Sequence, residues 1–134
     1  MNDHEILVTI GTVPYTTTIT QKSNTVIADE PQELGGQDEG FNPPALLLSS
    51  LGSCKAMTIK MYADRKKWNL EEVCIKLSYE TLKSELQQNT YIQCHISFKG
   101  DLDQVQKERL LQIADKCPIH KIMSNPIIIS SNLI

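Results

Sequence analysis

One run of the chain, Gly40 to Trp68, most constrains what it can fold into. The run opens with Asn42-Pro43-Pro44, and proline is tolerated in the first turn of a helix because its φ angle is already helical. From Ala45 to Ala56 the only charged residue is Lys55, and the others are apolar or small. A helix that is apolar or small on every side is usually buried. The run therefore predicts a long buried central helix over residues 43–67, about 35 Å in length at ~1.5 Å per residue.

Cys54 lies in the middle of this predicted helix, and two interpretations of it are open. Free cysteine is among the most buried residue types, so Cys54 is either a packed core thiol or the reactive atom of a site. A collar of small polar residues, which a packing position does not need, favours the reactive atom. The residues three, four or seven positions away share the helix face of Cys54: Leu47, Leu51, Thr58 and Met61. The collar directly precedes Cys54 and consists of Ser49, Ser50, Gly52 and Ser53.

Length and charge exclude several classes of protein. The chain has 134 residues, so we expect a single domain over residues 1–134. Its net charge is -3 and it has no basic block, which argues against nucleic acid as a partner. The longest weakly charged run is shorter than the ~20 residues of a membrane span, and the N-terminus lacks the positive start of a secretory signal. We therefore expect a cytoplasmic protein, whose four cysteines are reduced, catalytic or metal-binding.

The rest of the chain predicts strands on both sides of the central helix and a second helix after them. Short β-branched runs broken by glycine, proline and asparagine favour antiparallel strands, and strict alternation favours half-buried strands. Asp101 with Gln104 three residues later fits a capping box at the start of the second helix. The predicted fold is α+β, with antiparallel strands in 1–30, a surface connection over 29–41, strands over 70–79 and 91–99, a loop over 83–90, a helix ending near Cys117, a short turn of helix to Met123, and a last strand over 126–133.

Cys117 is the second cysteine that could do chemistry. It precedes Pro118, so it sits where an N-cap sits, and the free N–H groups and helix dipole there favour a thiolate. His120 and Lys121, within one turn, could add positive charge. The alternative is a small apolar residue closing the stripe of the second helix, and the residues alone leave both open.

The other cysteines and the other chemistries have weaker support. Cys74 and Cys94 lie in predicted strands, and we interpret both as structural. Cys117 and His120 form a C-x-x-H pair, but zinc usually takes two close pairs, and the adjacent Cys94 and His95 point to opposite faces of a strand. No nucleophile-elbow or phosphate-loop pattern is present. We therefore expect no metal and no cofactor.

Three motifs carry a family resemblance. They are N-P-P-A-L-L-L-S-S-L-G-S-C-K-A-M-T (42–58), then M-Y-A-D-R-K-K-W, then C-P-I-H-K (117–121). Together they resemble the OsmC/Ohr family, the osmotically inducible and organic hydroperoxide resistance proteins, and the order of elements matches over essentially the whole chain. The resemblance implies an α+β, OsmC-like fold made as an intertwined homodimer, with sites at the subunit interface built from both chains.

The resemblance also implies a function. Carried over, Cys54 is the peroxidatic cysteine that attacks a hydroperoxide, and Cys117 is the resolving cysteine that converts the sulfenic acid into a disulfide. The implied activity is a cysteine-based hydroperoxide reductase, a peroxidase of oxidative stress defence. Its substrate would be a small hydrophobic hydroperoxide, and its reductant a dithiol, for which a lipoyl-type group is one candidate.

One departure from the family pattern keeps an alternative open. Active members use an arginine from the N-terminal strands, held by a glutamate near the start of the central helix. This chain has only Arg65 and Arg109, and it has Pro44 and Ala45 where the glutamate is often found. The alternative is an OsmC-like binding module, or a redox sensor, without peroxidase turnover. Candidate replacements for the arginine are Lys22, His120 and Lys121.

Overall fold

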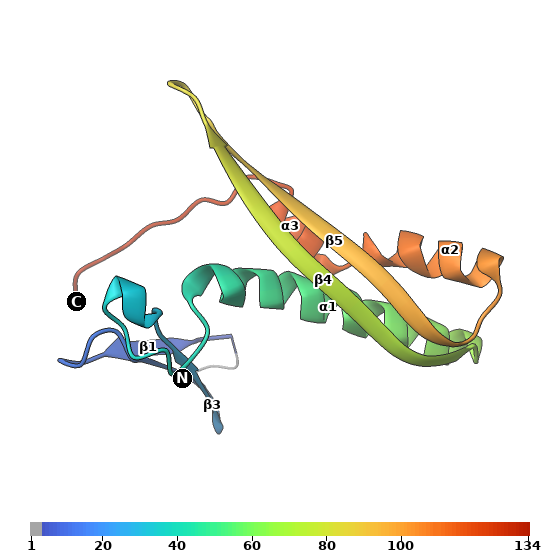
Figure 1. Cartoon of the computed structure of the whole chain (residues 1–134), viewed down its shortest axis with the longest axis horizontal. Coiled ribbons are helices and arrows are strands. Elements are labelled where there is room, and N and C mark those ends of the chain that lie inside the picture. The colour runs from blue at the N-terminus through green and yellow to red at the C-terminus, as the bar shows by residue number, and fades with distance from the viewer. Residues whose placement is uncertain (1–3) are drawn as a thin grey trace. The chain divides into compact units, whose positions relative to one another are not determined.

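The computed structural model describes residues 4–134 and divides the chain into two compact units, Met1–Leu47 and Leu48–Ile134 (Figure 1). Residues 1–3, the start of the expected N-terminal strand region, lie outside the described residues. The helix α1 (Pro43–Lys66) begins in the first unit and continues through the second. None of the helices in residues 4–134 has the length and apolar character needed to cross a membrane.

The first unit is a three-stranded antiparallel sheet with a folded connection after it. The strands are β1 (Leu7–Ile10), β2 (Thr17–Gln21) and β3 (Asn24–Ala28), in the order β1-β2-β3. A short 3-10 helix, η1 (Gln32–Leu34), lies in the connection. The antiparallel strands predicted from the β-branched runs are confirmed.

Asp29 organises this connection. Its side chain is buried and accepts backbone N–H groups of Glu30 at 2.8 Å, Tyr15 and Glu39 at 3.2 Å, and Gln37 at 3.3 Å. Burial alone would raise the pKa of the Asp29 carboxyl, but the four backbone hydrogen bonds outweigh it, and the pKa is lowered. An ionised carboxylate thus holds the loop closed on itself.

The bounds of the central helix agree with the predicted ones to within one residue. The prediction that this helix is buried on every side is wrong for this chain. The Asn42 side chain accepts the N–H of Ala45 at 3.0 Å and so caps its start. One stripe is buried: Leu51, Gly52, Lys55, Ile59 and Ala63. The side chains of Met57 and Met61 remain 59% exposed, because nothing else in the described chain covers that face.

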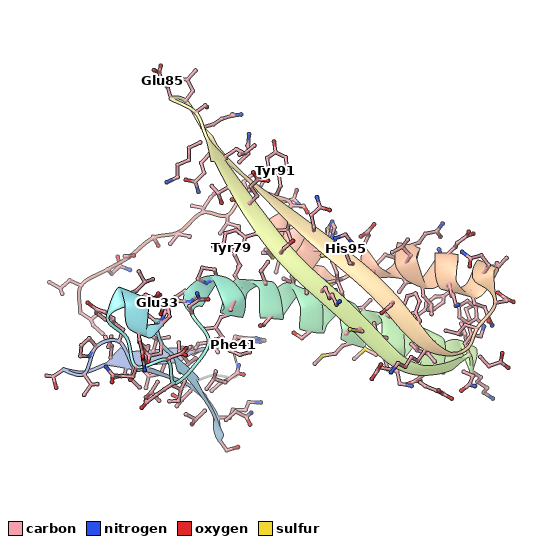
Figure 2. The ribbon with its side chains drawn as sticks, in the orientation of Figure 1. Glu33, Phe41, Tyr79, Glu85, Tyr91 and His95 are labelled. Carbon is pink, nitrogen blue, oxygen red and sulfur yellow. The ribbon has the colours of Figure 1, made fainter. Side chains whose placement is uncertain are left out.

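A long hairpin packs on the buried stripe of α1. Its strands are β4 (Asn69–Lys83) and β5 (Gln88–Asp101), paired antiparallel and longer than the alternating patterns predicted. Tyr79 and Tyr91 lie on the two strands, with Glu85 at the far tip (Figure 2). A Cβ on Gly52 would meet the Leu77 side chain, so glycine lets β4 approach the helix closely. The core is Ile59, Ala63, Leu70, Leu110 and Ala114.

Two helices complete the second unit. The helix α2 (Gln104–Ala114) starts two residues later than the predicted box, because Asp103 is the N-cap and forms a capping box with Gln106. The short helix α3 (Pro118–Met123) is confirmed with the predicted end at Met123.

The predicted C-terminal strand over 126–133 is wrong for this chain. The segment has no strand hydrogen bonds, and Ile128 and Ile129 are 96% and 83% exposed. A β-strand needs the edge of another strand to satisfy its backbone N–H and C=O groups. Among the described residues no strand pairs with this segment.

Candidate functional site

The structure brings Cys54 and Cys117 together. Cys54 lies on α1, and Cys117 lies between α2 and α3, with their side chains in hydrogen-bonding contact. Cys117 is fully buried and Cys54 is half-buried. All four cysteines in the described residues are free, but Cys74 is exposed on β4 and Cys94 faces a different cavity. Contact between the two thiols is what a peroxidatic and resolving pair requires, while their catalytic roles stay a prediction.

The turn that carries Cys117 has the N-cap geometry that the sequence predicted. Cys117 has extended backbone angles (φ -61°, ψ 129°), and Pro118 is the first residue of α3. The Sγ atom of Cys117 accepts the backbone N–H of His120 at 3.4 Å. Proline sets the helical φ angle at once and leaves no N–H to satisfy, so the turn is tight and points the thiol back at α1.

The electrostatic expectation for Cys117 is wrong, however. Burial raises the pKa of the Cys117 thiol, and the hydrogen bond with Cys54 raises it further, outweighing the opposing N–H groups of His120 and Ile119. Cys117 therefore keeps its proton at neutral pH and can donate it in the contact with Cys54. The N-cap position favoured a thiolate, but desolvation of a fully buried sulfur dominates.

Cys54 opens onto a cavity of about 400 Å³. Cys117 is not part of its wall, so a molecule in the cavity meets Cys54 first. The wall is mostly apolar, with hydroxyl groups from Ser50, Ser53 and Thr58, and this combination suits a small apolar molecule with one polar group. The lining residues are Ser50, Ser53, Cys54, Met57, Thr58, Met61, Pro118 and Ile119.

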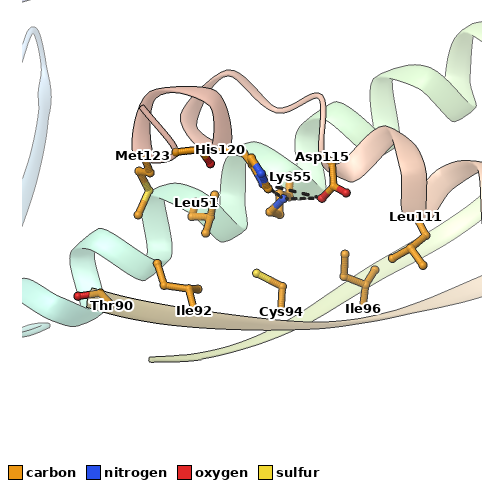
Figure 3. A pocket seen from close by; sticks show the side chains of 11 residues that line it. Leu51, Lys55, Thr90, Ile92, Cys94, Ile96, Leu111, Asp115, His120 and Met123 are labelled. Carbon is orange, nitrogen blue, oxygen red and sulfur yellow. Dashed lines mark hydrogen bonds and ion pairs between the residues drawn. The ribbon is translucent and has the colours of Figure 1, made fainter. Parts of the chain in front are cut away.

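Lys55 lies on the other side of α1 and is the residue that the sequence analysis missed. Its Nζ atom is 2.8 Å from His120 Nδ1 and 3.4 Å from Asp115 Oδ1 (Figure 3). The same atom is 3.0 Å from the Ala114 carbonyl oxygen. The side chain is only 3% exposed. The available signal was a single charge in an otherwise apolar or small run, because a lysine that is buried needs partners.

A second cavity, of about 430 Å³, lies on the Lys55 side (Figure 3). Burial raises the pKa of the Cys94 thiol, which faces this cavity. Cys94 is thus a protonated, partly buried thiol, and its structural role stays a prediction. In residues 4–134 no three side chains of His, Cys, Asp or Glu gather as metal ligands would.

Both arginines of the chain are engaged away from Cys54. Arg109 Nε donates to the Tyr62 hydroxyl at 3.1 Å, and this contact lowers the pKa of Tyr62. The guanidinium carbons of Arg65 and Arg109 lie 5.9 and 5.4 Å from the centre of the Tyr62 ring. Tyr62 follows Cys54 by two turns of α1, about 12 Å along the axis. Of the candidate replacements, His120 faces Lys55 instead of Cys54.

Comparison with known proteins assigns the family. A family model described as OsmC-like protein matches residues 36–132, so the chain belongs to the OsmC-like family. Its structure is similar to an OsmC like protein from Mycoplasma pneumoniae (TM-score 0.74, 18% identity, covering 92% of this chain and 88% of that one). No curated protein matches the chain.

Two further solved structures share the fold. One is an organic hydroperoxide resistance protein OsmC from Legionella pneumophila (TM-score 0.67, 21% identity, covering 92% of this chain and 91% of that one). The other is an organic hydroperoxide resistance protein from Elizabethkingia anophelis (TM-score 0.63, 15% identity, covering 90% and 88%). At these identities the likeness establishes the α+β, OsmC-like fold.

Proposed function

We propose that the protein is a thiol-dependent peroxidase that reduces small organic hydroperoxides through Cys54 and Cys117. The observation that carries the proposal is the contact between the Cys117 thiol and Cys54, which lines an apolar cavity. Membership of the OsmC-like family supports it, as do structural neighbours named for organic hydroperoxide resistance. The role would be oxidative stress defence in the cytoplasm, where free cysteines stay reduced.

The proposed chemistry balances with one hydroperoxide and one dithiol. The Cys54 thiolate attacks the outer oxygen of the peroxide, the O–O bond breaks, and the alcohol leaves after taking up a proton. The Cys54 sulfenic acid then condenses with the Cys117 thiol, forming the S–S bond and releasing water. A dithiol reductant, such as a lipoyl-type group, reduces this disulfide by two thiol exchanges and is itself oxidised to a disulfide.

The different burial of the two sulfurs supports different roles for them in the proposed reaction. Cys54 faces the cavity and Cys117 is buried behind it, so only Cys54 meets the peroxide directly. The protonated Cys117 thiol can donate to the Cys54 sulfur, and a hydrogen bond to a thiolate favours the charged form. This would supply part of the stabilisation that an arginine supplies in the family.

A homodimer is part of the proposal. Met57 and Met61 line the cavity and are more than half exposed, and the apolar C-terminal segment has no strand partner in the described chain. A second copy that covered these surfaces would close the cavity from above. Sites at the subunit interface, built from both chains, would then exclude water from the peroxide.

The alternative function is a binding module or redox sensor with the same cavity. The observation that favours it is the engagement of both arginines by Tyr62, away from Cys54. A guanidinium that orients a peroxide is then not available from Arg65 or Arg109. In this case the cavity would hold a small apolar ligand, or the thiol pair would record oxidation without turnover.

The test is a thiol count with a matched control. Reduced protein is mixed with one equivalent of cumene hydroperoxide, and two of its four thiols should be lost. Cys54→Ser should lose none, and Cys74→Ser, altered at the exposed strand cysteine, should react like the wild type. Loss of no thiols, or equally fast loss in Cys54→Ser, contradicts the proposal. Rapid oxidation without steady-state consumption under dihydrolipoamide would identify a sensor instead.

A further inference from the structure

We propose that Lys55 is a positioning residue that fixes the Cys117 turn against α1 and so sets the approach of Cys117 to Cys54. This inference rests on the Cys54/Cys117 pair of the proposed function. Lys55 does not line the Cys54 cavity and is not part of the contact between the two thiols. It directly follows Cys54 on the central helix.

One ammonium group binds the chain on both sides of Cys117. Before the cysteine it donates to the carbonyl oxygen of Ala114. It also donates to Asp115 Oδ1 before the cysteine and to His120 Nδ1 after it (Figure 3). An ammonium has three donors, and these three acceptors use all of them. Moving the turn away from α1 would remove these partners from a buried ammonium group, which is energetically unfavourable.

His120 connects Lys55 to the sulfur of Cys117. Its ring nitrogen faces Lys55 at 2.8 Å, while its backbone N–H donates to Cys117 Sγ at 3.4 Å. His120 is therefore hydrogen-bonded both to the helix that carries Cys54 and to the Cys117 sulfur. Disulfide formation needs the two Cα atoms within about 7 Å and a narrow range of side-chain angles, so a fixed turn raises the effective concentration of Cys117 at Cys54.

The contact also requires an acceptor on the His120 side chain. An ammonium only donates, so Nδ1 of His120 is the acceptor in this contact. Asp115, at the end of α2, lies 3.8 Å from the same ring nitrogen, but its side chain is 72% exposed. A side chain in place of His120 that cannot accept from Lys55 is therefore expected to loosen the turn.

The experiment measures the Cys54–Cys117 disulfide without any peroxide. Full-length protein is equilibrated in mixtures of reduced and oxidised dithiothreitol, and the disulfide is quantified by mass spectrometry. Lys55→Met should lower the equilibrium constant for the disulfide roughly 10- to 100-fold, the effect of losing hydrogen bonds to a charged group. Lys55→Arg, which keeps donors, should restore most of the loss. Lys60→Met is the matched control, since Lys60 pairs with Asp64 on the exposed side of the same helix.

Two variants of His120 separate positioning from a general packing effect. Glutamine keeps an acceptor for Lys55, so His120→Gln should retain most of the wild-type equilibrium constant. His120→Leu, which cannot accept, should lower that constant.

Each outcome decides the inference. Equal constants for the wild type, Lys55→Met and Lys60→Met overturn it, as does a wild type that forms no Cys54–Cys117 disulfide at any dithiol ratio. If Lys55→Met does not fold, the His120 pair carries the test, and equal constants for His120→Gln and His120→Leu overturn the inference. A protein that is inert to hydroperoxides but shows the Lys55 dependence refutes the proposed function alone.

Discussion

Replacing Cys117 tests whether its proton stabilises the reactive form of Cys54. Cys117→Ala removes the donor in the contact between the two side chains, whereas Cys117→Ser keeps a hydroxyl donor at the same place. If Cys117 donates to a thiolate, Cys54 should be less nucleophilic in the alanine variant than in the serine variant. The measured quantity is the rate of Cys54 alkylation by iodoacetamide at pH 7, followed by mass spectrometry of the Cys54 peptide.

The size of the effect follows from the burial of the two sulfurs. A hydrogen bond to a charged group contributes about 1.5–3 kcal/mol, which corresponds to roughly 10- to 150-fold. Cys54 is half-buried and faces an open cavity, so solvent replaces part of the lost contact and the lower end applies. We expect alkylation about tenfold slower in Cys117→Ala than in Cys117→Ser. Equal rates in the wild type and both variants would contradict this prediction, because the contact would then have no influence on Cys54.

Three further predictions concern stability. Because the pKa of Asp29 is lowered in the folded protein, its carboxylate stabilises the fold at pH values above the ordinary aspartate pKa. This stabilisation is lost as the pH falls through the lowered pKa. Asp29→Asn should therefore lower the urea midpoint of unfolding more at pH 7 than at pH 2. Gly100 has a φ of 135°, and a Cβ there would collide with a backbone carbonyl of β4. Gly100→Ala should therefore lower the free energy of unfolding, measured in thermal melts, by at least about 1–3 kcal/mol. Gly11→Ala, with open space around it, is the control, and an equal loss in both would contradict the prediction. Leu110→Ala, at a fully buried position, should cost about 2–5 kcal/mol in urea unfolding, and Leu111→Ala, at a 54% exposed position, far less.

The sequence predicted the elements whose ends are marked locally. Prolines mark the starts of α1 and α3, and both helices lie within one residue of their predicted bounds. The start of α2 was displaced because Asp101 and Asp103 are each followed three residues later by a glutamine. Asp101 pairs with Asn69 at the end of β5, so only Asp103 is free to cap the helix. Choosing between the two caps required the strand register, which is not a local property.

The remaining features depend on contacts between distant segments. The β-branched residues after Pro126 favour a strand, but a strand forms only beside an edge, and local pattern does not supply one. The apolar character of α1 predicted burial on all sides, while this chain covers only one stripe. The partners of Lys55 come from the end of α2 and from α3, far along the chain. Only the family resemblance, not periodicity, pointed to Cys54 and Cys117 as a pair.

The central claim is that Cys54 and Cys117 are joined by hydroperoxide. Reduced protein is treated with one equivalent of cumene hydroperoxide, blocked with iodoacetamide, digested and mapped by mass spectrometry without reduction. We expect a single major cross-linked species joining the Cys54 and Cys117 peptides, with Cys74 and Cys94 alkylated. A Cys54 that remains unoxidised, or oxidised cysteines that pair with Cys74 or Cys94 instead, would contradict it.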